Sequence, residues 1–237
     1  MTPDENYQPF RIPFDGHFLA GDTLSRGDGV SVLVLHGGGD SGRMRMRAVR
    51  ERLFLEGISS CAFDFIGHGE TGGNLKESSL YQRTLQALRV VESQKIAQPV
   101  TIIAASMGAY TAVRLLKHIA VDTLILLVPA MYAACAYRTP FGRGFTAIIR
   151  EPESWHRSDA WEILSGYRGR LFLVAAEKDT VIPSDVIDRI SGAAANTKEF
   201  VRHTVSGAPH AVFTYLRSVS PDRLERIMRQ MIDMIGK

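Results

Sequence analysis

Short apolar stretches recur along the chain and alternate with longer segments of mixed polarity. The first two cover residues 10–14 and 18–24, and the Asp15-Gly16 pair between them is typical of a tight β-hairpin turn. From residue 30 onward most of the apolar runs are continuous rather than alternating, which is typical of strands that helices cover on both faces. These runs lie at residues 30–35, 60–65, 100–105, 123–128, 171–176 and 200–205.

Segments with apolar residues at helical spacing lie between these runs. We expect helices near residues 44–56, 79–95, 107–118 and 184–192, and a last helix that Ser220 caps and Pro221 begins. Strands that alternate with helices predict an α/β fold with a mostly parallel sheet flanked by helices. A chain of 237 residues falls within the range of one such domain, so we expect a single domain over residues 1–237.

One segment interrupts the alternation. The 42 residues from 129 to 170, called the 129–170 insertion below, hold 7 of the chain's 20 aromatic residues, including both tryptophans. An irregular segment of this length inside a compact domain is often functional. Its aromatic content equally suits extra helices that pack on a small core of their own. The two interpretations are compatible, because a lid over a site also needs a core.

Charge and composition narrow the function. The net charge of +3 is spread along the chain and argues against a nucleic-acid partner. The densest basic run, from Arg43 to Arg50, we interpret as the solvated side of a helix. The polar N-terminus is unlike a signal peptide, and the longest apolar run is far too short to cross a bilayer. We therefore expect a cytoplasmic protein without membrane insertion; its oligomeric state cannot be inferred from these patterns.

Cysteine and histidine usage bears on redox chemistry and metals. Two cysteines, Cys61 and Cys135, cannot make a disulfide framework in a chain of this length, and Cys61 is expected to be a small buried side chain. No Cys/His cluster has the spacing of metal ligands. We expect neither a metal nor an organic cofactor.

A serine stands where an expected strand meets an expected helix. Ser106 follows the apolar run at 100–105, and Ala104 and Gly108 lie two residues away on either side. A tight strand–turn–helix requires small residues at these two positions and lifts the serine hydroxyl above the end of the strand. Ser106 is therefore a candidate nucleophile, with a simple helix N-cap as the alternative.

Three glycines follow the apolar run at 30–35. Gly37 to Gly39 come directly after His36, and their uncovered backbone N–H groups suit a developing oxyanion. A phosphate-binding loop or a flexible turn is the alternative, although neither a P-loop nor a complete dinucleotide-binding motif is present. The helix that begins near Met107 directs its positive N-terminal end to the same region.

A nucleophilic serine needs a base within hydrogen-bond reach and an acid that orients the base. Among the seven histidines, His210 lies in a loop after the last expected strand, where catalytic groups are commonly presented. Asp179 follows the run at 171–176 and is the candidate acid, with Glu177 and Asp185 as rivals. An Asp at that place is also a common turn residue.

Nearly the whole chain resembles an α/β-hydrolase. The matching segments are His36 to Gly39, Asp64 to Gly69 with Thr71 where Ser is common, Ala104 to Gly108, Asp179 to Pro183 and Gly207 to His210. The resemblance implies an eight-stranded, mostly parallel sheet with a small cap insertion at 129–170. It also implies that the turn containing Asp64 and His68 is structural and borders the site.

The same resemblance assigns roles to individual residues. It makes Ser106 the nucleophile, Asp179 the orienting acid and His210 the base, in the chain order of the family. The backbone N–H groups of Met107 and Gly38 would form the oxyanion hole, with Gly37 or Gly39 as less favoured donors. Ala104 departs from the commonest motif, a change that some lipases share.

The implied reaction is acyl transfer through an acyl-enzyme to water, on a small-molecule substrate. The aromatic insertion favours a carboxylic ester with an apolar or aryl acyl group, and small bacterial esterases, cinnamoyl and feruloyl esterases and monoacylglycerol-lipase-like enzymes are similar. Thioester, amide or carbon–carbon bond hydrolysis uses the same residues. An acyltransferase and a non-catalytic ligand-binding protein remain as alternatives.

Overall fold

Eight strands form one sheet in the computed structural model, which describes residues 2–27 and 29–235. Residues 1, 28, 236 and 237 of the predicted 1–237 domain lie outside the described residues. The strands are β1 (Tyr7–Phe14), β2 (His17–Leu24), β3 (Val32–Leu35), β4 (Ser60–Phe63), β5 (Val100–Ala105), β6 (Val121–Leu127), β7 (Arg170–Ala176) and β8 (Glu199–Val205). All eight expected strands are confirmed.

The sheet is mostly parallel, as predicted. Its order is β1-β2-β4-β3-β5-β6-β7-β8, and the two N-terminal strands pair antiparallel while the others run parallel. Strands β3 and β4 are buried along their whole length, and β5 to β7 along most of it. The edge strand β8 alternates between half-buried and exposed residues over most of its length, so it is an exception to the cover on both faces that was expected for most strands.

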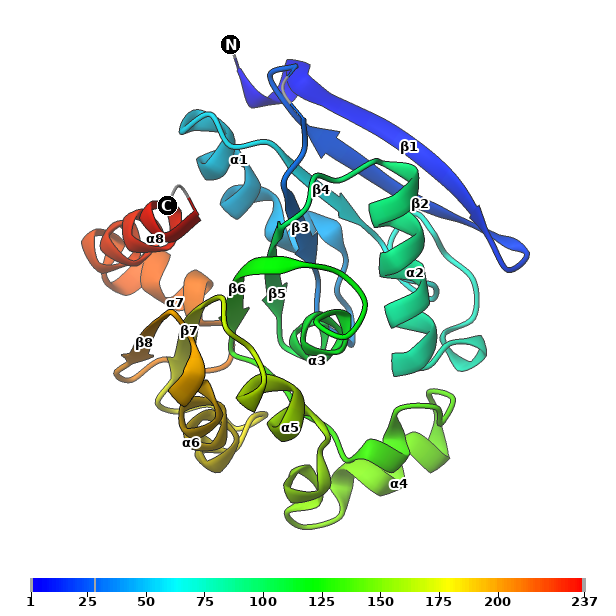
Figure 1. The fold of residues 1–237 in the computed structure, drawn as a ribbon, viewed down its shortest axis with the longest axis vertical. Helices are drawn as coiled ribbons and strands as arrows, with labels where there is room; N and C mark the ends of the chain where they lie inside the picture. The colour runs from blue at the N-terminus through cyan, green and yellow to red at the C-terminus, as the bar shows by residue number, and fades with distance from the viewer. Residues whose placement is uncertain (1, 28, 236–237) are drawn as a thin grey trace.

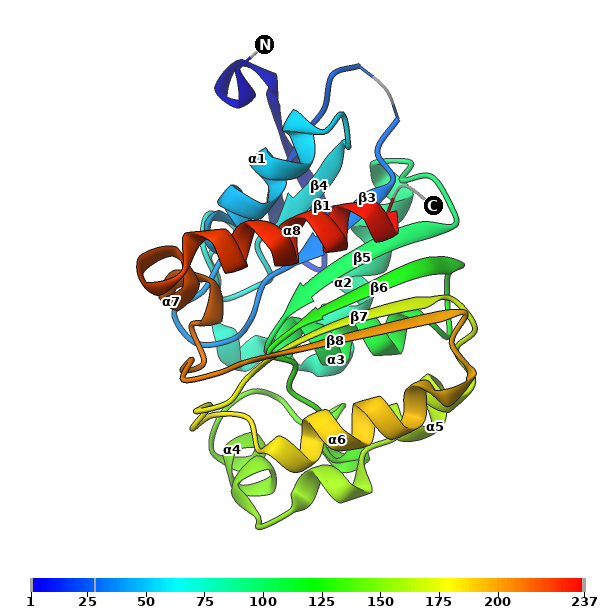
Figure 2. The ribbon, with the colours of Figure 1, turned by 90° about the vertical axis from the view of Figure 1, so that its left-hand side faces the viewer.

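Helices cover both faces of the sheet (Figures 1 and 2). On one side lie α1 (Arg47–Leu55), α7 (Val212–Val219) and α8 (Pro221–Ile235). On the other lie α2 (Leu80–Ser93), α3 (Met107–Leu115), α5 (Ala160–Ser165) and α6 (Ser184–Ala193), with α4 (Arg143–Arg150) beyond them. Short 3-10 helices complete the chain: η1 (Pro3–Asn6), η2 (Arg43–Met46), η3 (Leu75–Glu77), η4 (Ala134–Ala136), η5 (Ser154–Arg157) and η6 (Ala194–Asn196). Two apolar clusters, one on each face, form the core.

The 129–170 insertion contains η4, α4, η5 and α5. Its aromatic side chains join the cluster that α2 and α3 also form, instead of making a separate core. Asp159 binds the Tyr110 hydroxyl of α3 at 2.7 Å and pairs with Arg114. Asp185 of α6 accepts hydrogen bonds from Trp155 and His156 of the insertion, each at 2.8 Å. The insertion is thus attached to the helices on one face of the sheet.

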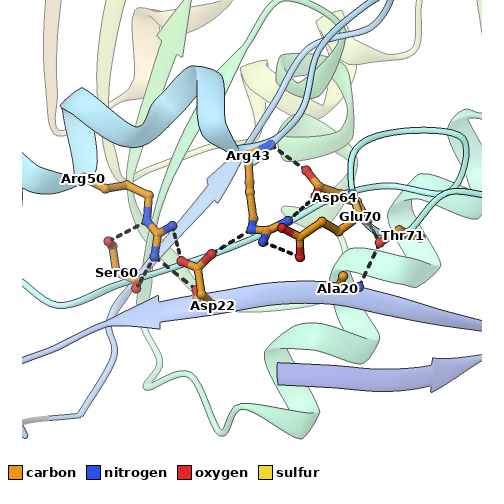
Figure 3. Close-up of polar contacts among 8 residues, drawn as sticks. All are labelled: Ala20, Asp22, Arg43, Arg50, Ser60, Asp64, Glu70 and Thr71. Atoms are coloured by element: carbon orange, nitrogen blue, oxygen red, sulfur yellow. Dashed lines mark hydrogen bonds and ion pairs between the residues drawn. The ribbon is translucent and has the colours of Figure 1, made fainter. Parts of the chain in front are cut away.

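A network of buried charges crosses the N-terminal half of the sheet (Figure 3). Asp22 of β2 accepts from the Arg43 Nε at 2.7 Å and also pairs with Arg50, which donates to the Ser60 hydroxyl at 3.1 Å. The interpretation of Arg43 to Arg50 as a solvated face is therefore wrong at both ends, where the guanidinium groups are buried. Their carboxylate partners lie on other elements, and the local sequence pattern does not reveal them.

The turn after β4 extends this network. Asp64 accepts from the Arg43 backbone N–H at 2.7 Å and pairs with the Arg43 side chain. The Thr71 hydroxyl donates to the Asp64 carbonyl at 2.6 Å and accepts from the Ala20 N–H at 2.8 Å. Gly69 has a φ of +46°, and a Cβ there would lie 2.3 Å from the Asp64 carboxylate. Because these contacts hold the turn together, Asp64 is a structural residue here, as the resemblance implied.

Candidate active site

Ser106 occupies a strained turn between β5 and α3. Its φ of 49° and ψ of −120° are uncommon for a residue with a side chain. Three backbone hydrogen bonds hold the turn: the Ser106 N–H donates to Leu127 at 2.9 Å, and the Ser106 carbonyl accepts from Ala109 at 3.0 Å and from Ala130 at 3.1 Å. The Ser106 side chain makes no N-cap hydrogen bond, which argues against the simple capping role.

Gly108 explains why a small residue is required just after the turn. A Cβ at this position would lie 2.6 Å from the His36 carbonyl oxygen and 2.9 Å from that of Leu35. The conflict is with the end of β3, so Gly108 lets α3 approach the glycine loop.

The structure brings the three predicted triad residues together. The His210 Nε2 lies 3.2 Å from the Ser106 Oγ, and the His210 Nδ1 lies 2.8 Å from the Asp179 Oδ2. An ionised carboxylate can only accept, so a neutral His210 carries its proton on Nδ1 and presents Nε2 as an acceptor to Ser106. This tautomer is the one in which a histidine acts as a general base toward a serine.

Asp179 is fixed from its other side. Its Oδ1 accepts from the backbone N–H groups of Val181 at 2.8 Å and Ile182 at 3.0 Å, and its side chain is 5% exposed. The rival acids have other partners. Glu177 binds Ser206 and the Gly207 N–H, which lower the Glu177 pKa, and Asp185 attaches the insertion to α6. The geometry therefore favours Asp179 over both.

The glycine loop lies against Ser106. A Cβ on Gly37 would be 3.2 Å from the Ser106 Cβ, and one on Gly38 would be 2.9 Å from the Met107 Cε. The Gly37 carbonyl accepts from the His36 Nδ1 at 2.8 Å and from the Arg83 Nη1 at 3.1 Å. The peptide between Gly37 and Gly38 is trans, so the Gly38 N–H points away from these two donors.

Arg83 is a residue that the sequence analysis missed. Its side chain is fully buried and extends from α2 to the glycine loop, where it contacts the Gly37 carbonyl. A signal was present, since Arg83 follows Leu80 by three residues and precedes Ala87 by four, on the apolar stripe of the helix. A charged residue at a core position of a helix calls for a partner elsewhere in the fold.

A cavity of about 290 Å³ opens at Ser106 and His210. Its apolar wall comes from Met46 and Val49 near the start of α1, Val128 after β6, and Val212 and Phe213 of α7. These elements pack on the face of the sheet that bears α8. None of the lining residues belongs to the 129–170 insertion.

Residues 2–27 and 29–235 contain neither a metal-binding cluster nor a membrane-spanning helix. No group of three or more His, Cys, Asp or Glu side chains in this part of the chain is arranged to hold a metal ion. No helix among the same residues is long and apolar enough to span a membrane. Cys61 is buried and Cys135 is exposed, and burial raises the pKa of the Cys61 thiol to about 12.

Residues 29–152 match the family model described as serine aminopeptidase, S33 (Hydrolase_4). An alignment of 112 residues, which covers 44% of this chain, is 31% identical to the multifunctional-autoprocessing repeats-in-toxin of Vibrio cholerae. That match covers 2% of the toxin, so the chain spans a very small part of this curated relative.

Solved structures resemble the whole chain. The esterase Pf2001 of Pyrococcus furiosus has a TM-score of 0.72 and 21% identity over 98% of this chain and 94% of its own. Est1E of Butyrivibrio proteoclasticus with bound ferulic acid has a TM-score of 0.72 and 20% identity, covering 96% of this chain and 100% of its own. The esterase EaEST of Exiguobacterium antarcticum has a TM-score of 0.73 and 17% identity, covering 97% and 100%. At these identities the likeness shows the shared fold.

Proposed function

The chain belongs to the serine aminopeptidase S33 family of α/β-hydrolases, and from this premise we propose that it hydrolyses carboxylic esters with Ser106 as nucleophile. It is an esterase-like member of the α/β-hydrolase fold. One observation carries the proposal: His210 bridges Ser106 and Asp179 with hydrogen-bond distances of 3.2 and 2.8 Å. A nucleophile, a base and an orienting acid in contact are the requirement for acyl transfer at a serine.

The mechanism follows from the positions of these groups. Ser106 attacks the ester carbonyl while His210 accepts the Ser106 proton, and Asp179 stabilises the resulting imidazolium. His210 then protonates the leaving alcohol, the C–O bond breaks, and the acyl group stays on Ser106. A water molecule that His210 deprotonates releases the carboxylic acid in the second half of the cycle.

The oxyanion of each tetrahedral intermediate needs donors beside Ser106. We assign this role to the backbone N–H groups of Met107 and Gly38. Met107 is the first residue of α3, where backbone N–H groups lack intrahelical acceptors and the helix end is positive. Gly38 lines the cavity, and its N–H points away from the two groups that hold the Gly37 carbonyl.

The cavity supports a small, apolar substrate group. A volume of about 290 Å³ is at the lower end for ligand sites, and the wall formed by Met46, Val49 and Phe213 is apolar. The esterases of similar fold, and the ferulic acid bound to Est1E, agree with an acyl or aryl group of this size. We further propose that the 129–170 insertion belongs to a single hydrolase domain; it packs with α2 and α3 and contributes no side chain to the cavity at Ser106.

The nucleophile can be tested directly. We would treat the purified protein with a fluorophosphonate probe and identify the labelled peptide by mass spectrometry. Wild type should be labelled at Ser106, Ser106→Ala should not be labelled, and Ser218→Ala should behave like wild type, because Ser218 is an exposed serine outside the cavity. Labelling that persists at another residue in Ser106→Ala would contradict the assignment.

Substrate class needs a second assay. Initial rates on 4-nitrophenyl acetate and butyrate, on the matching 4-nitroanilides and on an acyl thioester compare ester, amide and thioester hydrolysis at one site. We expect the esters to react fastest. A folded protein that is labelled at Ser106 but prefers the anilide would support a peptidase, the activity in the family's description.

A further inference from the structure

Arg83 is a buried cation to which the described residues supply no counter-ion. Its side chain is fully buried, and no ion pair to it exists within residues 2–27 and 29–235. Burial lowers the pKa of the Arg83 guanidinium to about 10, so the side chain stays protonated at neutral pH. Its Nε also lacks a hydrogen-bond partner in the described part of the chain. A fold gains nothing in stability from such a group unless its remaining contacts compensate.

The contacts that Arg83 does make converge on the glycine loop. Its Nη1 donates to the Gly37 carbonyl at 3.1 Å, and its Nη2 lies 3.1 Å from the His68 Nε2. The His68 Nδ1 lies 3.3 Å from the Ile66 carbonyl, so a neutral His68 donates there and accepts from Arg83. Burial and the Arg83 charge lower the pKa of His68, which favours this neutral form.

His36 supplies the second hydrogen bond to the Gly37 carbonyl. Its Nε2 accepts from the Phe65 backbone N–H at 3.1 Å, which leaves the proton on Nδ1 to donate to the Gly37 carbonyl at 2.8 Å. Burial, with the Arg83 charge in addition, holds the pKa of His36 well below its ordinary value. The Gly37 carbonyl therefore accepts one neutral and one cationic hydrogen bond.

On these contacts we propose that Arg83 is a positioning residue of the oxyanion hole, which orients and polarises the Gly37–Gly38 peptide so that the Gly38 N–H faces the reacting carbonyl. This inference rests on the function proposed above. A trans peptide whose carbonyl is held on one side presents its N–H on the other. A cation at the carbonyl oxygen also draws electron density from the peptide and makes the N–H a stronger donor.

The surroundings of Arg83 fit this role. The guanidinium lies 4.4 Å from the centre of the Phe65 ring and 5.5 Å from that of Phe141 in the insertion. Aromatic faces hold a cation without adding a negative charge. A carboxylate at the same place would oppose the anion that forms at Ser106, whereas an uncompensated cation favours it.

The test compares Arg83→Met, Arg83→Lys and a matched control, Arg114→Met. Arg114 is a largely buried arginine of α3 that pairs with Asp159 and has no contact with the glycine loop. We would measure kcat and KM on 4-nitrophenyl butyrate per fluorophosphonate-labelled site, the melting temperature, and the inhibition constant of a trifluoromethyl ketone. The ketone forms an oxyanion on Ser106 without turnover, so its affinity reports the oxyanion hole directly.

For Arg83→Met we expect kcat to fall by about 10–100-fold, with a much smaller change in KM. The trifluoromethyl ketone should lose affinity by a similar factor. The melting temperature should not fall in proportion to kcat, because the substitution removes a buried cation without a counter-ion. Arg83→Lys should recover part of the lost rate by restoring the charge. Arg114→Met should show the opposite pattern, a lower melting temperature with kcat per labelled site retained.

Several results would overturn the inference. An unchanged kcat in Arg83→Met, a ketone affinity that does not follow kcat, or an Arg83→Lys no better than Arg83→Met each removes the proposed role. A wild-type protein that neither labels at Ser106 nor cleaves esters would instead refute the proposed function. Ester hydrolysis that depends on Ser106 but not on Arg83 refutes the role of Arg83 alone.

Discussion

Replacing Asp22 with Asn should destabilise the fold strongly. The Asp22 side chain is 9% exposed and binds two guanidinium groups, those of Arg43 and Arg50 (Figure 3). Asn has nearly the same shape but no charge. Its NH₂ group would face a guanidinium N–H, which is also a donor. Arg43 retains Asp64 and Glu70 as partners, whereas Arg50 loses its carboxylate partner.

The size of the effect follows from burial. Breaking a buried ion pair on one side usually costs about 3–5 kcal/mol in the free energy of unfolding. Arg50 is 2% exposed but keeps hydrogen bonds to the Ser60 hydroxyl and to the carbonyls of Asp22 and Ser60. We therefore expect a loss near the lower end, about 3 kcal/mol, a large fraction of the roughly 5–15 kcal/mol typical of a folded domain.

Urea unfolding followed by circular dichroism measures this loss. With a denaturant slope of about 3 kcal/mol per molar, the midpoint should fall by roughly 1 M. Asp188→Asn is the control, because Asp188 is 63% exposed and pairs with Arg202 at the surface. That pair should contribute at most about 1 kcal/mol. If Asp22→Asn shifts the midpoint no more than Asp188→Asn does, the buried network is not a source of stability and the reasoning is wrong.

Three further predictions concern the site and its pH dependence. Asp179→Asn should reduce kcat by about 10⁴-fold through loss of the correct His210 tautomer, while Asp185→Asn should leave kcat close to wild type in the same ester assay. Gly108→Ala should reduce both activity and fluorophosphonate labelling, since the added Cβ would lie 2.6 Å from the His36 carbonyl oxygen; labelling at the wild-type rate would contradict this. Burial lowers the pKa of His36 and His68 below the ordinary 6.5, so the unfolded chain binds protons that the fold excludes. Stability should therefore be complete above about pH 6.5 and fall as the pH drops, by up to about 1.4 kcal/mol per pH unit for each histidine. Urea midpoints measured from about pH 7.5 to 5.5 check this, and a midpoint that rises on acidification would refute it.

Hydrophobic periodicity was sufficient to predict the sheet. Each strand overlaps an expected strand-like stretch, and the observed limits differ from the expected ones by at most three residues. Helix α7 was missed because it begins two residues after His210 and spans only Val212–Val219, too short for a clear helical period. The edge position of β8 was also missed, since strand order depends on pairings between distant segments.

The candidate site residues that follow directly on a strand could be predicted from the sequence. Ser106 and the glycine loop follow strands directly, so the order of strands and small residues marks them. Choosing among Glu177, Asp179 and Asp185 required the fold, because the three lie within nine residues and differ in the distant groups they contact. Arg83 was missed for the same reason, since its partner Gly37 lies 46 residues away.

The elements that form the apolar wall of the cavity at Ser106 pack on one face of the sheet, and the 129–170 insertion packs on the other. For enzyme engineering, this separation divides the molecule into two regions that can be mutated in separate rounds. Libraries at Met46, Val49 and Phe213 change the shape of the cavity and leave the aromatic packing of the insertion intact. Exchanging the insertion for one of another length, in contrast, alters the packing around Phe141 and Arg83. With the role proposed for Arg83, such an exchange should act on turnover rather than on substrate preference.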